Sequence, residues 1–200
     1  MNIAVFVSGN GTNLQAIIDA IQSGYINSTI GLVLSDNKEA YALKRAIKSG
    51  IDTVFIDPKA YDSREDFDKA VIKHLKEKNI GLICLAGYMR LLSPYFIKEY
   101  ESKIINIHPA LLPSFKGMHG VRNALNYGVK ITGPTVHFVT EEFDSGPIIS
   151  QSVVEVMGDD TEESLTERVH EVEYKIYPEA IKDLVEGKLK LVGRKVLRKQ

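Results

Sequence analysis

Short runs of apolar, often β-branched residues recur along the first half of the chain and predict buried strands. They lie at residues 3–7, 30–34, 53–56, 82–85 and 104–107. Stretches with the spacing of amphipathic helices separate most of these runs, and this alternation is typical of parallel βαβ units. Near-continuous apolar strands indicate burial on both faces, which occurs when helices cover both sides of a sheet. We therefore predict a Rossmann-like α/β fold, with a mostly parallel sheet and helices on both faces.

Several polar and glycine residues mark where the predicted helices begin and end. Ser63 followed by Asp66 is typical of a capping box and predicts a helix that runs through Lys76. Gly24 and Gly50 lie where the preceding helices should stop.

The pattern changes in the last third of the chain. Two longer extended runs, 134–139 and 147–156, predict antiparallel strands added to the far edge of the sheet. A last helix is predicted over 161–185, and Pro178 in its interior predicts a kink or a break near Tyr177.

Basic and apolar residues alternate in the tail after Gly187. The runs 188–192 and 195–198 predict a small surface hairpin, and a phosphate-attracting arm is the alternative. We expect one domain over 1–200, with 187–200 as a basic extension.

Composition narrows the class of partner. The chain has 200 residues, 44% hydrophobic and 26% charged, as in an ordinary globular domain. Its 25 basic and 26 acidic residues give a net charge of -1, which offers no case for nucleic acid as the main partner. No apolar run approaches the ~20 residues of a membrane span, so we expect a cytoplasmic enzyme that acts on small molecules without membrane association. The single Cys84 lies in an apolar run and is expected to be a buried thiol.

A glycine-containing loop, Ser8–Asn13, connects the first strand to the first helix. Glycines let backbone N–H groups approach an anion, and the helix dipole adds partial positive charge, so the loop predicts a phosphate site. Two alternatives stay open. One is a plain tight turn between strand and helix. The other is a dinucleotide-binding site, since Gly9 and Gly11 match the start of the dinucleotide-binding fingerprint and Asp36 lies near the position of its ribose-binding acid. However, Leu14 occupies the place of the third glycine.

Three polar residues predict a catalytic centre together, although each alone has a structural explanation. Asn106 and His108 are two residues apart on a predicted strand, so both side chains point to the same face. Asp144 lies in an acidic turn between two extended runs. A carboxylate that reaches a histidine fixes its tautomer and favours the protonated ring, which makes a useful proton donor.

The other histidines fit no such centre. His74 lies on a charged helix and is expected to be solvated, and His137 lies in a strand as a structural histidine. No His, Cys and Asp spacing is typical of a metal site, so no metal is expected.

These motifs carry a resemblance that spans nearly the whole chain. The segments 7–17, 85–92, 106–115, 135–139 and 144–147 are similar to those of the phosphoribosylglycinamide formyltransferase family of purine biosynthesis. The resemblance implies that 10-formyltetrahydrofolate is the co-substrate. It also implies that Asn106, His108 and Asp144 are catalytic while the glycinamide amine attacks the formyl group.

The resemblance also implies two sets of binding residues. The substrate would be bound by Gly11, Thr12, Asn13, His170 and Glu173. The folate would be bound by Arg64, Met89, Arg90, Leu91, Leu92, Asn106, Thr140, Glu141, Glu142, Phe143 and Asp144.

Three other functions share parts of this pattern. A methionyl-tRNA formyltransferase would use the same trio, but its additional C-terminal tRNA domain is not expected in a chain of this length. A formyltetrahydrofolate hydrolase would let water attack, and its N-terminal regulatory domain is not expected because the glycine loop begins at Ser8. The hydrolase stays the enzyme alternative, and a dinucleotide-binding module is the alternative from another class.

Overall fold

The structure is a computed structural model that describes residues 1–199. The chain divides into two compact units, Met1–Ile105 and Asn106–Gln200. The organisation of the chain as one domain stays a prediction.

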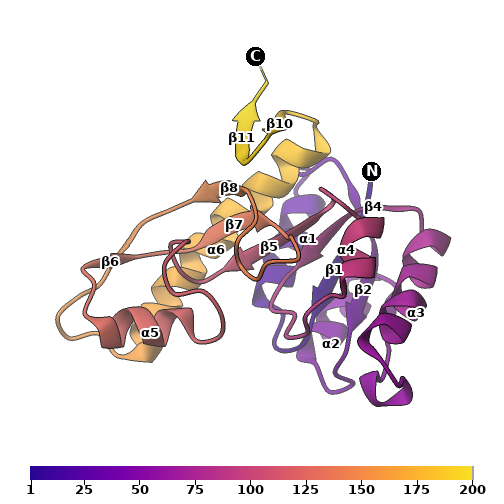
Figure 1. The fold of residues 1–200 in the computed structure, drawn as a ribbon, viewed down its shortest axis with the longest axis horizontal. Helices are drawn as coiled ribbons and strands as arrows, with labels where there is room; N and C mark the ends of the chain where they lie inside the picture. The colour runs from indigo at the N-terminus through magenta and orange to yellow at the C-terminus, as the bar shows by residue number, and fades with distance from the viewer. Residues whose placement is uncertain (200) are drawn as a thin grey trace. The chain divides into compact units, whose positions relative to one another are not determined.

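The first unit contains four parallel strands in the order β3-β2-β1-β4 (Figure 1). They are β1 (Asn2–Val7), β2 (Thr29–Ser35), β3 (Thr53–Phe55) and β4 (Ile80–Leu85). A fifth strand, β5 (Ile104–His108), begins in this unit and ends in the next. All five predicted apolar runs are therefore strands. In β1 the residues from Ile3 to Val7 are fully buried, as the unbroken apolar run indicates.

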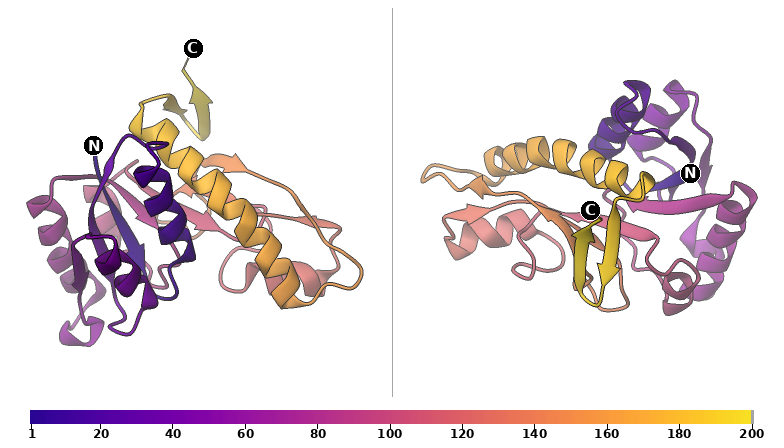
Figure 2. Two further views of the ribbon diagram at one scale, coloured as in Figure 1. Left: turned by 180° about the vertical axis from the view of Figure 1, so that it is seen from behind. Right: turned by 90° about the horizontal axis from the view of Figure 1, so that it is seen from above.

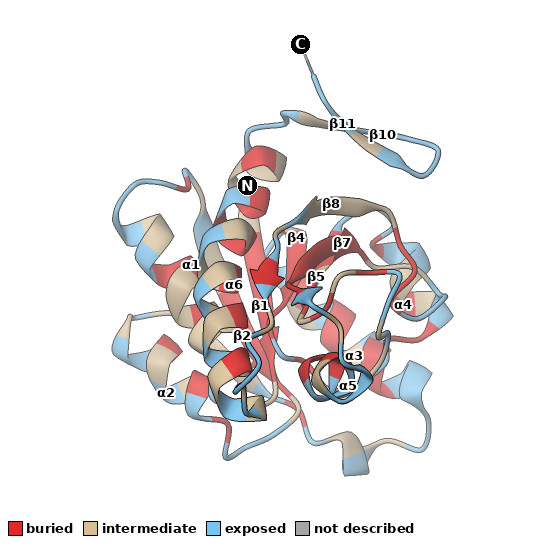
Figure 3. Ribbon diagram, turned by 90° about the vertical axis from the view of Figure 1, so that its left-hand side faces the viewer, coloured by how far each residue is buried: buried red, intermediate tan, exposed pale blue. Residues whose placement is uncertain are grey.

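Helices cover both faces of these four strands. The helices are α1 (Thr12–Gln22), α2 (Tyr41–Lys48), the 3₁₀ turn η1 (Pro58–Ala60), α3 (Arg64–Glu77) and α4 (Pro94–Glu99). Figure 3 shows α1 and α2 on one side of β1 and β2, and α3 and α4 on the other. Right-handed crossovers require this, because β2 and β3 extend the sheet to one side of β1 and β4 lies on the other.

The predicted helix boundaries in this unit are confirmed. The Ser63 hydroxyl accepts the Asp66 N–H at the start of α3. Gly24 and Gly50 follow α1 and α2 with φ of 76° and 70°, the left-handed region that glycine adopts without strain.

The second unit adds antiparallel pairs. The order is β5-β7-β8, with β7 (Thr135–Phe138) antiparallel to β8 (Ile148–Gln151). A separate pair joins β6 (Ile131–Thr132) to β9 (Val154–Glu155). The predicted extended run 147–156 is thus two strands in different sheets. This arrangement confirms the α/β fold with antiparallel additions in the C-terminal part. Helix α5 (Gly120–Tyr127) precedes β6.

The last helix, α6 (Glu162–Val185), runs without interruption through Pro178 (Figure 2). The predicted break near Tyr177 is therefore wrong, and the kink that was its alternative stays a prediction. Tyr177 is 1% exposed and Pro178 is buried as well, so packing offsets the hydrogen bond that proline cannot donate. Thr161 caps the helix through the Ser164 N–H.

The predicted hairpin at the C-terminus is confirmed. It consists of β10 (Leu189–Val192) and β11 (Lys195–Arg198), which pair antiparallel. The Arg198 guanidinium lies 2.6 Å from the Asp183 carboxylate of α6. Within residues 1–199, no helix is long and apolar enough to cross a membrane.

Candidate active site

The second unit brings the predicted trio together at the end of β5. Asn106 and His108 share one face of this strand, and His108 is only 4% exposed. Asp144 is 7% exposed, and its carboxylate Oδ2 lies 3.4 Å from His108 Nδ1. The same oxygen accepts the Gly117 N–H at 2.8 Å. The acidic turn is therefore folded inward at Asp144, where sequence alone allowed a solvated surface.

Tight backbone packing holds this turn in place. Asp144 has a φ of 45°, a conformation that aspartate tolerates better than most residues. A β-carbon on Gly146 would lie 1.7 Å from the Phe138 carbonyl oxygen, so only glycine fits there. The end of β7 and the turn therefore approach each other closely, which fixes the position of the Asp144 carboxylate.

His108 faces an oxygen atom with each ring nitrogen. Its Nε2 lies 2.9 Å from the Phe115 carbonyl oxygen, while Nδ1 faces Asp144. A protonated ring donates from both nitrogens and suits both acceptors. Phe115 belongs to a loop with a cis Leu112–Pro113 peptide bond. The Lys116 ammonium in the same loop contacts the Ser145 hydroxyl.

His137 belongs to the same polar network, although the sequence interpretation assigned it a structural role only. It is 2% exposed, and its Nε2 lies 3.6 Å from Asp144 Oδ1 and 3.3 Å from Asn106 Nδ2. Its Nδ1 lies 2.9 Å from the Phe138 carbonyl oxygen, which can only accept.

Burial lowers the pKa of His137, and the charge of His108 lowers it further, against the Phe138 hydrogen bond and Asp144. A neutral ring with its proton on Nδ1 leaves Nε2 to accept from the Asn106 amide. His137 thereby orients that amide. The sequence signal was its place in a strand beside the Asp144 turn.

The first unit contains the predicted phosphate loop. Gly11 precedes α1 with φ 76° and ψ 35°, and Thr12 and Asn13 form its first turn. Within the described chain no side chain caps this helix, and the first turn carries no acidic residue. Such an N-terminus suits an anion. A β-carbon on Gly11 would lie 2.5 Å from that of Ala42, so glycine is required here.

The carboxylate of Asp36 has a partner that argues against the dinucleotide alternative. The Ser8 hydroxyl donates to Asp36 Oδ1 at 2.6 Å and accepts the Met89 N–H at 2.9 Å. Asp36 Oδ1 thus already has a protein partner, which links it through Ser8 to the segment after β4.

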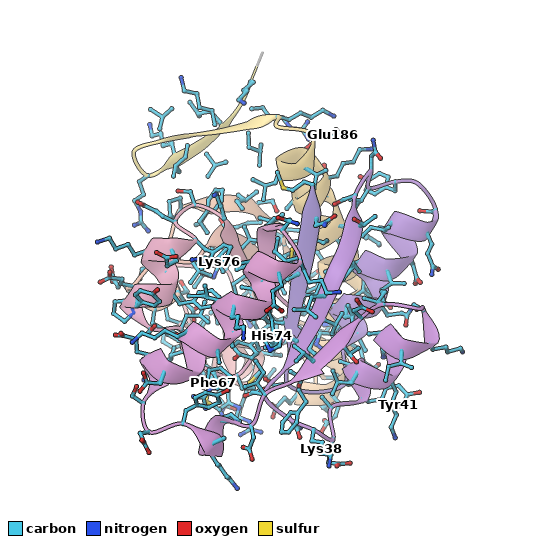
Figure 4. The ribbon with its side chains drawn as sticks, turned by 90° about the vertical axis from the view of Figure 1, so that its right-hand side faces the viewer. Lys38, Tyr41, Phe67, His74, Lys76 and Glu186 are labelled. Carbon is cyan, nitrogen blue, oxygen red and sulfur yellow. The ribbon has the colours of Figure 1, made fainter. Side chains whose placement is uncertain are left out.

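The predicted folate residues of this unit lie on α3 and on the segment after β4. Arg64 is the first residue of α3, and the Arg90 guanidinium lies 4.6 Å from the Phe67 ring centroid. Figure 4 shows Phe67 on α3. Met89 and Leu91 are 68% and 50% exposed. Leu92 is buried.

The remaining predicted residues belong to the second unit. The turn 140–144 is closed by the Thr140 hydroxyl, which donates to the Glu142 carbonyl at 3.1 Å. Phe143 is 48% exposed, and Glu141 is exposed too. On α6, His170 Nε2 lies 3.9 Å from the buried Glu173 carboxylate. Burial lowers the pKa of His170. In the described chain, no three His, Cys, Asp or Glu side chains form a group that could hold a metal ion.

Comparison with known proteins gives the family. Residues 1–181 match the model of the formyl transferase family. The chain belongs to this family. Phosphoribosylglycinamide formyltransferase of Escherichia coli (strain K12) is 44% identical over 96% of this chain and 90% of its own length.

Two further relatives extend the comparison of this formyl transferase. A crystal structure of glycinamide ribonucleotide transformylase 1 from Symbiobacterium toebii is 46% identical, with a TM-score of 0.98 over 100% of this chain and 94% of that chain. The trifunctional purine biosynthetic protein adenosine-3 of Gallus gallus is 47% identical over 94% of this chain, which spans 19% of that larger protein.

Proposed function

We propose that this formyl transferase moves the formyl group of 10-formyltetrahydrofolate to the amine of 5'-phosphoribosylglycinamide, in purine biosynthesis. The observation that carries the proposal is the polar network of Asn106, His108, His137 and Asp144 in a chain closely related to phosphoribosylglycinamide formyltransferases. Members of the family use folate-derived formyl donors. Such a biosynthetic enzyme would work in the cytoplasm on small molecules.

The trio meets the needs of this acyl transfer. The amine attacks the formyl carbon, a C–N bond forms, and the carbonyl oxygen becomes an oxyanion. The Asn106 amide donates to this oxygen, and removing one such donor typically lowers the rate about 10²- to 10³-fold.

His108 completes the reaction as a proton carrier. Its protonated ring, held beside the Asp144 carboxylate, stabilises the same charge. The bond from carbon to N10 of the folate then breaks, N10 gains a proton, and the former amine loses one. Asp144 relays that second proton through water. General acid–base catalysis of this kind typically contributes about 10²- to 10⁴-fold.

The two binding sets divide between the substrates. Gly11, Thr12 and Asn13 bind the phosphate at the start of α1. His170 and Glu173 contact the glycinamide or ribose. The folate contacts are proposed for Arg64, Met89, Arg90, Leu91, Leu92 and the backbone of 140–144.

A single assay tests the proposal. The protein is incubated with 10-formyltetrahydrofolate, with and without 5'-phosphoribosylglycinamide, and tetrahydrofolate release is followed. Turnover that depends on the amine supports the proposal, and its absence would overturn it. Equal release without the amine would instead indicate a hydrolase.

A further inference from the structure

The guanidinium of Arg45, on α2, forms hydrogen bonds to the glycine loop. Arg45 Nε–H donates to the Asn10 carbonyl oxygen at 2.9 Å, and an Nη2–H donates to the Asn10 side-chain oxygen at 3.2 Å. An Nη1–H reaches the Gln15 side-chain oxygen in the first helix at 3.4 Å. The planar fork of arginine suits such a set of parallel bonds. One half-buried side chain therefore connects the loop to the helix that follows it.

Other contacts from α2 hold the same loop. The Ala42 N–H donates to the Gly9 carbonyl at 3.1 Å. The missing β-carbon of Gly11 leaves room for Ala42. The guanidinium itself lies 4.9 Å from the Tyr41 ring centroid, and Figure 4 shows Tyr41 at the start of α2. Stacking on this ring orients the fork so that its N–H groups point to the loop.

The hydrogen bonds of Arg45 have an electrostatic consequence for an anion bound at this loop. Carbonyl oxygens repel a phosphate, and Arg45 engages both oxygens of Asn10. The positive charge stays close to a helix start that lacks acidic residues in its first turn. Because the Arg45 N–H groups donate to protein oxygens of Asn10 and Gln15, Arg45 acts on the anion through the loop.

We propose that Arg45 is a positioning residue, which holds the loop from Gly9 to Asn13 in the conformation that accepts the 5'-phosphate of the substrate. This inference rests on the proposed function for the choice of phosphate ester. Lysine has no planar fork and replaces only part of the contact, so Arg45→Lys should rescue part of the effect.

The test compares Arg45→Met and Arg45→Lys with the control Lys48→Met. Lys48 is an exposed cation on the same helix, so its loss removes the same charge. Binding of ribose 5-phosphate is measured by calorimetry, and KM and kcat are measured for both substrates. Circular dichroism checks the fold.

In Arg45→Met we expect the Kd of ribose 5-phosphate and the KM for 5'-phosphoribosylglycinamide to rise about 10- to 100-fold, as for lost hydrogen bonds to a charged group. The KM for the folate and kcat should change less than about threefold. The Kd and KM of Arg45→Lys should lie between those of Arg45→Met and the wild type, and those of Lys48→Met should match the wild type.

Three results would overturn the inference. They are no binding of ribose 5-phosphate by the wild type, an unchanged Kd in both Arg45 variants, and an equal rise in the KM of both substrates. If Arg45→Met fails to fold, Arg45→Lys decides alone. Failure of the proposed function would show differently, as wild-type protein that binds ribose 5-phosphate but lacks amine-dependent turnover.

Discussion

Asp144→Asn removes one negative charge and leaves the shape of the side chain unchanged. The side chains of Asp144 and His108 are each 5% exposed, and Oδ2 lies 3.4 Å from Nδ1. At that separation, an effective dielectric constant of about 20 gives about 5 kcal/mol of attraction between the two charges. The new amide oxygen still accepts the Gly117 N–H, and its NH₂ group faces His137 Nε2. The fold should therefore persist.

We expect kcat for formyl transfer to fall about 10³-fold in Asp144→Asn, within the range for general acid–base catalysis. The full 5 kcal/mol, about 4,000-fold, is an upper limit because the turn can relax. The assay is kcat at saturating substrates, with a thermal melt on the same samples. Asp159→Asn, an exposed acid before α6, is the control and should keep wild-type kcat. A variant that melts as the wild type does and retains more than about a tenth of kcat would refute the reasoning.

Two further substitutions test the packing and protonation around the trio. Burial lowers the pKa of His137 from 6.5, so the unfolded state takes up a proton first as the pH falls. Its contribution to stability is present above the unfolded value of 6.5 and is lost as the pH falls below it through the lowered pKa of the folded state. In His137→Gln, the free energy of unfolding measured with urea should fall less steeply as the pH is lowered. Equal pH dependence in the variant and the wild type would contradict this. Gly146→Ala should cost about 1–3 kcal/mol or more, because its methyl group meets the Phe138 carbonyl. Gly158→Ala, with open space around its β-carbon, is the control. A loss of under about 0.5 kcal/mol in the free energy of unfolding of Gly146→Ala would refute this prediction.

Local chemistry explains which parts of the fold were predictable. Apolar runs gave the strands of the first unit, because burial on both faces leaves no polar position. Caps such as Ser63 act on backbone groups only a few residues away. By contrast, the run 147–156 divides between two sheets because its partners, β7 and β6, come from different places in the chain. The continuity of α6 through Pro178 likewise depends on distant packing.

The residues of the candidate site likewise include some that the sequence predicts and some that depend on distant contacts. Strand periodicity placed Asn106 and His108 on one face, and the chemistry of a carboxylate beside a histidine pointed to Asp144, whose catalytic role the family resemblance also implied. The sequence put His137 in a strand beside the Asp144 turn, but its contacts with Asp144 and Asn106 depend on how the chain folds, which spacing alone does not reveal. Arg45 was missed because its partners are mainly the oxygens of Asn10, 35 positions earlier, and backbone acceptors leave no signature in a sequence.

The four polar side chains of the network come from one continuous stretch, residues 106–144, and its loop contacts, Phe115 and Gly117, come from the same stretch. Gly146, which admits the Phe138 carbonyl, follows at once. A single genetic recombination over this stretch would carry the whole network intact into a related gene. The glycine loop precedes β2 and would be left behind. On the roles proposed above, acyl-transfer chemistry and phosphate binding would thus be inherited on separate segments of the gene.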